Sequence, residues 1–131
     1  MRIAPWLGLV ALLSIPSLAL AADPPDQASL SLKTTQDLYR VCAAGPSDAR
    51  AQEELDLCEG FLAGAVSYHD AISDRRHLKR LICYPSTATR DQGIQAFVTW
   101  AGANQGNQRY MGDPAVYGVV RALASKWPCG K

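Results

Sequence analysis

The segment DARAQEELDLCEGFLAGAVSYHDAI, residues 48–72, predicts the longest helix of the chain. Residues suited to a buried face recur along it at steps of three and four, the spacing of one side of an α-helix: Leu55, Cys58, Leu62, Ala65, His69 and Ile72. Gly60 and Gly64 lie on a neighbouring face, and each weakens a helix interior by roughly 1 kcal/mol relative to alanine. We therefore expect another backbone to approach these glycines closely, within the subunit or across a dimer.

Capping signals place a helix on either side of this segment. Thr34 and Asp37 have the spacing of a capping box, which predicts a helix that begins at residue 34 or 35 and ends at Gly45-Pro46. Thr89 and Gln92 repeat the pattern and begin a third helix.

A fourth helix is expected after Asp113-Pro114, since aspartate favours the N-cap and proline favours the first helical position. The preceding residues, 102–112, are interpreted as a polar loop. No strand pattern competes with these helices, so the sequence predicts an all-α fold with four main helices.

The first 21 residues have the features of an export signal. Arg2 gives a positively charged start, residues 6–20 are mostly apolar, and Ala19-Leu20-Ala21 has the small-x-small pattern of a cleavage site. We expect cleavage after Ala21 or Ala22 and a periplasmic location. No second apolar run long enough to span a bilayer follows, so no membrane association is expected after cleavage.

The expected domain organisation is a signal peptide over 1–21, a flexible tail over 22–33 and a helical domain over 34–131. That domain contains four cysteines, an even number without a Cys-x-x-Cys pair: Cys42, Cys58, Cys83 and Cys129. In an exported chain this pattern is typical of a disulfide framework.

Three pairings of the cysteines are possible. We predict Cys42–Cys58, which joins the first two helices, and Cys83–Cys129, which ties the start of the third helix to the end of the fourth. The result would be a small four-helix domain stapled by two disulfides.

Charge argues against nucleic acid as a partner. The chain has 13 Lys+Arg and 12 Asp+Glu, and removing Arg2 with the signal leaves 12 of each, a formal net charge of zero. Electrostatic capture of nucleic acid or anionic lipid is therefore not expected.

The sequence contains no catalytic constellation, and we expect no enzyme activity, no cofactor and no metal. His69 falls on the apolar face of the long helix, where a hydrogen-bonded core histidine is the expected role, and His77 lies among arginines. A cysteine nucleophile would need an unpaired thiol, and the even count leaves none.

Short motifs along the chain resemble one known family. They are Asp37-Leu38-Tyr39-x-x-Cys42, Cys58-x-Gly60-Phe61-Leu62-x-Gly64, Cys83-x-Pro85, Thr89-x-x-Gln92, Ala122-Leu123 and Trp127-Pro128-Cys129. In this order they resemble the Rap/Tai-type immunity proteins of bacterial type VI secretion systems, over residues 36–129.

The resemblance implies a periplasmic, helical, disulfide-bonded and commonly dimeric protein that binds and blocks a secreted peptidoglycan amidase. Loops between helices suit partner recognition, so we predict that 102–112 contributes to this contact. Its candidate partner-binding residues are Asn104, Gln105, Asn107, Arg109 and Tyr110. An alternative is a periplasmic helical binding or chaperone-like module without a dedicated toxin.

Overall fold

A computed structural model describes residues 32–45, 47–76 and 78–130 of the chain, and the predicted signal peptide lies outside them. The described residues form five α-helices and contain no β-strand beyond two isolated bridges. The bounds of the helices are α1 Thr35–Cys42, α2 Ala51–Arg76, α3 Arg90–Ala103, α4 Gln108–Gly112 and α5 Ala115–Lys126. The all-α class is therefore confirmed.

The prediction of four helices is wrong by one helix. The additional helix, α4, lies inside the stretch that was predicted to be a loop, and α3 continues through Gly102 to Ala103. A five-residue helix is too short to show the periodicity on which the prediction rested.

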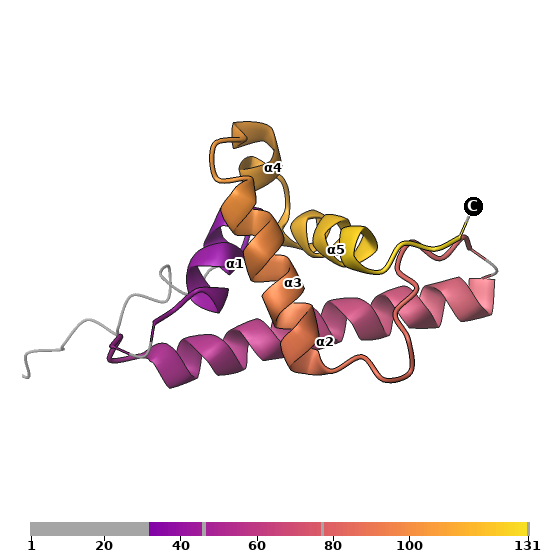
Figure 1. The fold of residues 1–131 in the computed structure, drawn as a ribbon, viewed down its shortest axis with the longest axis horizontal. Helices are drawn as coiled ribbons and strands as arrows, with labels where there is room; N and C mark the ends of the chain where they lie inside the picture. The colour runs from indigo at the N-terminus through magenta and orange to yellow at the C-terminus, as the bar shows by residue number, and fades with distance from the viewer. Residues whose placement is uncertain (1–31, 46, 77, 131) are drawn as a thin grey trace, which may run out of the picture.

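Helix α2 lies along one side of the molecule, and α1, α3 and α5 pack on it and on one another (Figure 1). Helix α3 crosses α2 steeply, while α1 and α5 flank α3 on either side (Figure 1). Helix α4 lies at the end of α3 that is remote from α2 (Figure 1). The elements in mutual contact include α1, α3 and α5, which enclose Phe97, Leu38 and Val119 in the core.

Both predicted capping boxes are present. The Thr34 hydroxyl accepts the backbone N–H of Asp37, the Asp37 carboxylate accepts the N–H of Thr34, and Thr89 and Gln92 do the same at α3. The predicted Asp113 cap is wrong. Pro114 is the N-cap of α5, and the carboxylate of Asp113 pairs instead with Arg121 at 2.7 Å.

The buried face of α2 is rotated from the predicted one. Cys58, Leu62 and His69 are buried as expected, but Leu55 is 37% exposed and polar side chains lie at both ends of the face: Glu54 and Ser73 are buried. The helix also begins three residues later than predicted and ends four residues later. The buried face of α2 therefore contains more polar residues than the spacing of hydrophobic residues predicts.

Both predicted disulfides are present. Cys42 is bonded to Cys58 and Cys83 to Cys129, with Cα–Cα distances of 5.1 and 4.9 Å. The late start of α2 brings Cys58 level with the end of α1. Cys83 lies in an extended segment ahead of α3, where its N–H donates to the carbonyl of Trp127 at 2.9 Å.

The predicted close contact at Gly60 and Gly64 within the subunit is wrong. Among the described residues, a Cβ at either position would meet nothing within 4 Å, whereas a Cβ at Gly118 would lie 2.4 Å from Cγ2 of Thr35. Helix α5 therefore approaches the first turn of α1 closely at Gly118. A contact of Gly60 and Gly64 across a dimer stays a prediction.

Candidate functional site

The residues predicted to bind a partner lie on a turn and a short helix, residues 104–112, which we call the α4 segment. The side chains of Gln105, Asn107, Gln108 and Arg109 are exposed on it. Met111 is only 4% exposed and fixes the segment to the core. The structure therefore presents four polar side chains from one anchored element.

Three of the predicted residues form side-chain hydrogen bonds within the segment or to α3. The amide nitrogen of Asn104 donates to the Trp100 carbonyl at 2.7 Å, and the amide oxygen of Asn107 caps α4 by accepting the N–H of Tyr110 at 3.2 Å. Gln105 donates weakly to the Ala101 carbonyl at 3.5 Å. These bonds hold the turn in one conformation.

Tyr110 does not project freely into solvent. Its ring stacks on Trp100 of α3, with centroids 5.8 Å apart, and the guanidinium carbon of Arg121 in α5 lies 4.7 Å from its centroid. Arg121 also pairs with Asp113, just after α4. The prediction that Tyr110 contacts a partner is untested, but its ring already contacts Trp100 and Arg121 within the chain.

Arg109 dominates the charge of this surface. It is the only charged residue between positions 92 and 112. The nearest carboxylate beyond that stretch, that of Asp113, is neutralised by Arg121. The exposed part of the α4 segment is thus a set of amides around one cation.

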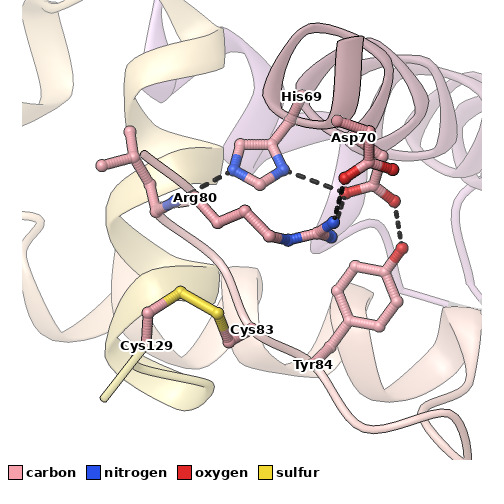
Figure 2. A network of polar contacts seen from close by, with 8 residues as sticks. His69, Asp70, Arg80, Cys83, Tyr84 and Cys129 are labelled. Carbon is pink, nitrogen blue, oxygen red and sulfur yellow. Dashed lines mark hydrogen bonds and ion pairs between the residues drawn. A yellow bond between two sulfur atoms is a disulfide. The ribbon is translucent and has the colours of Figure 1, made fainter. Parts of the chain in front are cut away.

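A second polar cluster fixes the connector between α2 and α3, residues 78–89. Figure 2 shows His69 and Asp70 of α2 facing Arg80 and Tyr84 of the connector. Arg80 pairs with Asp70 at 2.7 Å, the Tyr84 hydroxyl donates to Asp70, and the backbone N–H of Leu81 donates to Nε2 of His69 at 3.1 Å.

These contacts confirm the structural role predicted for His69, which is 7% exposed. Because Nε2 accepts the Leu81 N–H, the ring proton lies on Nδ1 and faces Asp70 Oδ1 at 3.0 Å. Neither ring nitrogen is then free to take a proton from a substrate.

The same contacts perturb the acidity of the cluster. Burial alone would raise the pKa of Asp70, but hydrogen bonds from Tyr84 and His69 and the charge of Arg80 lower it below its usual value. The hydrogen bond to Asp70, followed by burial, raises the pKa of Tyr84.

We expect the free energy of unfolding to fall as the pH drops below about 4. The depressed pKa of Asp70 means that the unfolded chain takes up this proton first, so the contribution is present at neutral pH and is lost in acid. Tyr84→Phe should lower stability at pH 7 and weaken the acid dependence, as measured by urea unfolding at several pH values. Tyr68→Phe, at a 68% exposed position, is the control; equal pH dependence in both variants would contradict the prediction.

An open groove of about 260 Å³ lies between α2, α3, the end of α5 and the connector. Leu62, Ile94, Leu123 and Trp127 contribute apolar surface to it, and Trp127 meets Tyr84 edge-on with centroids 6.2 Å apart. An ion pair between Glu59 and Arg90, at 2.5 Å, lies among the lining residues. The groove is mainly apolar and carries balanced charges.

No group of three or more potential metal-ligating side chains occurs in the described part of the chain. The helices found there include none with the length and hydrophobicity needed to cross a membrane.

Sequence reasoning singled out Tyr110 but did not predict that it stacks on Trp100, and it missed Arg121. No local signal connects Arg121 to Tyr110, because the two residues belong to different helices. Their contact follows from the packing of α5 against α3.

The geometry defines a class of protein. In the described residues, the histidine cluster serves to hold the connector, while exposed amides and a cation are displayed on a helical scaffold tied by two disulfides. This is the organisation of a small binding domain.

The chain belongs to the Rap1a immunity protein family, whose sequence profile matches residues 34–129. No curated protein and no solved structure showed significant similarity. Immunity proteins are generally non-enzymatic inhibitors, and the family indicates that this chain protects against a secreted toxin. The resemblance to Rap/Tai-type immunity proteins is confirmed at this level.

Proposed function

We propose that the mature protein is a non-catalytic periplasmic inhibitor that binds and blocks a peptidoglycan amidase delivered by a type VI secretion system. The observation that carries this proposal is the α4 segment, which presents exposed amides and Arg109 from an internally hydrogen-bonded turn. A surface that is already ordered loses little conformational entropy when it binds. It can therefore occlude a substrate groove without chemistry of its own.

Two further features support the finer parts of the proposal. The two disulfides suit an oxidising compartment such as the periplasm. The solvent-facing glycines Gly60 and Gly64 of α2 have no close neighbour among the described residues to account for their cost, and we propose that they lie in the interface of a homodimer.

Arg109→Ala should weaken toxin binding by at least about 2 kcal/mol, or roughly thirtyfold in Kd, if this arginine is an interface hot spot. Arg109 is exposed and makes no side-chain contact within the described residues, so the substitution should leave the fold intact. The measurement is calorimetric titration with a secreted peptidoglycan amidase that wild type neutralises, together with survival on co-expression. Lys126→Ala, an exposed cation at the far end of α5, is the matched control.

Equal protection by Arg109→Ala and wild type would remove Arg109 from the toxin contact. Failure of wild type to protect would instead favour the chaperone-like alternative. That alternative has its own support in the apolar groove and in two exposed leucines of the connector, Leu78 and Leu81.

A further inference from the structure

The α4 helix is too short to be stable by itself. It has five residues, whereas isolated helices of fewer than about 12 residues are marginal in water. Its order must therefore come from contacts with the rest of the domain. Met111 supplies one through its burial, Trp100 stacks on Tyr110, and α1 packs against α4. Arg121 of α5 adds contacts with both Tyr110 and Asp113.

Arg121, in α5, contacts one residue within α4 and one directly after it. Its guanidinium lies over the ring of Tyr110 inside α4, and its Nη2 pairs with the carboxylate of Asp113 directly after α4 at 2.7 Å. The Tyr110 ring also stacks on Trp100 of α3. One side chain thus connects α5, α4 and, through Tyr110, α3.

The atomic details favour an arginine at this position. Nη1 of Arg121 is buried and forms no hydrogen bond within the described residues. A buried donor without a partner is unfavourable, and here the aromatic face of Tyr110 is the compensating contact. Lysine could still reach a carboxylate, but it lacks the planar group that stacks on a ring.

We propose that Arg121 is a positioning residue for partner recognition: it fixes α4 through Tyr110 and Asp113 so that Arg109 and its neighbouring amides face the partner in one orientation. This inference rests on the proposed function of the α4 segment. It also reassigns Tyr110, which the sequence suggested as a contact residue, to the support of that surface. Arg109 then becomes the main side chain that the partner meets.

The charge of the α4 segment indicates the kind of surface that the partner offers. Arg109 is exposed and lacks a carboxylate partner within the described residues, and the adjacent exposed side chains are amides. A fixed cation surrounded by amides fits a recess that presents a carboxylate and backbone polar groups. Arg121 would set where that cation points.

Arg121→Lys tests the positioning role by hydrogen exchange of the mature protein. The amides of Tyr110, Met111 and Asp113, which donate to Asn107 and Arg109, should lose about tenfold or more of their protection. Amides in the cores of α2 and α3 should keep theirs. Arg109→Ala and Tyr110→Phe are the matched controls. Both keep the guanidinium of Arg121 and an aromatic ring at position 110, so both should leave the protection of these amides unchanged.

The second readout is affinity for the secreted amidase that wild type neutralises. Arg121→Lys should weaken binding about tenfold or more even though Arg109 is intact. Unchanged exchange in the α4 segment, exchange that rises throughout the domain, or local loosening with unchanged affinity would each overturn the inference. If wild type neutralises no such amidase, the proposed function fails, while the exchange pattern still decides whether Arg121 fixes α4. Asp113→Asn provides a second variant, with a smaller local loss expected because the ring contact remains.

Discussion

Gly118→Ala should destabilise the protein by about 2 kcal/mol, even though alanine is the better helix former by roughly 1 kcal/mol. The new Cβ would lie 2.4 Å from Cγ2 and 2.6 Å from Oγ1 of Thr35. Thr35 is fully buried, and its backbone N–H and hydroxyl both donate to the carbonyl of Asp113. Since a β-branched side chain has little rotamer freedom, α5 must move away from α1. Thermal unfolding should show a midpoint about 10 °C lower.

The matched control is Gly93→Ala in α3, where a Cβ would meet nothing within 4 Å. It should raise stability by about 0.5–1 kcal/mol, so the two identical substitutions should have opposite signs. Adding Thr35→Ala to Gly118→Ala removes the two closest atoms and should recover part of the loss. A Gly118→Ala protein that melts at or above the wild-type temperature would show that this close approach is absent.

The two disulfides should open in a fixed order when a dithiol reductant is added under native conditions. Cys42 and Cys58 are 5% and 0% exposed, whereas Cys83 is exposed and Cys129 is half-buried. Thiolate attack requires access to a sulfur, so Cys83–Cys129 should be reduced about tenfold faster or more. Quenching with an alkylating reagent at timed intervals, followed by peptide mapping, gives the order. Labelling of all four cysteines together, or of Cys42 and Cys58 first, would contradict it.

Removing the buried disulfide, Cys42–Cys58, should also lower the free energy of unfolding more than removing Cys83–Cys129. Cys42→Ala/Cys58→Ala removes a crosslink worth about 3 kcal/mol in the loop-entropy treatment and leaves a cavity in the core. Cys83→Ala/Cys129→Ala removes the crosslink that closes the longer loop, but it removes little core packing. The polar contacts of Asp70 still hold the connector on α2. Urea unfolding of the two variants separates the loss of packing from the loss of a crosslink.

Local chemistry was sufficient to predict several features from the sequence. The capping boxes at Thr34 and Thr89 fix the starts of α1 and α3 because their hydrogen bonds span only three residues. His69 could be assigned to the core because it lies on the same face as Cys58 and Leu62. The pairing of the cysteines followed from the order of the helices.

Features that depend on distant contacts were not predictable in this way. Gly60 and Gly64 attracted attention through their spacing, yet the close approach occurs at Gly118, whose partner Thr35 lies at the other end of the domain sequence. The buried face of α2 includes Glu54 and Ser73, two polar residues that hydrophobic spacing does not place there.

The candidate site shows the same division. The sequence identified the stretch around Arg109 as polar and suited to recognition, but it predicted a loop where α4 forms. Arg121 carried no sequence signal, since its partners Tyr110 and Asp113 come into reach only when α5 packs beside α3. Local patterns indicated where the surface lies, and the tertiary structure showed what holds it.

The placement of the disulfides gives the chain an uneven covalent connectivity. One bond closes a ring over residues 42–58 and the other closes a ring over residues 83–129. A single proteolytic cut inside either ring leaves the protein in one covalent piece, but a cut between residues 59 and 82 divides it into two. That linking stretch includes the second half of α2 and the exposed Lys79 of the connector. After cleavage there, only non-covalent contacts would keep the two halves together, chiefly the packing of α1 and α2 against α3 and α5.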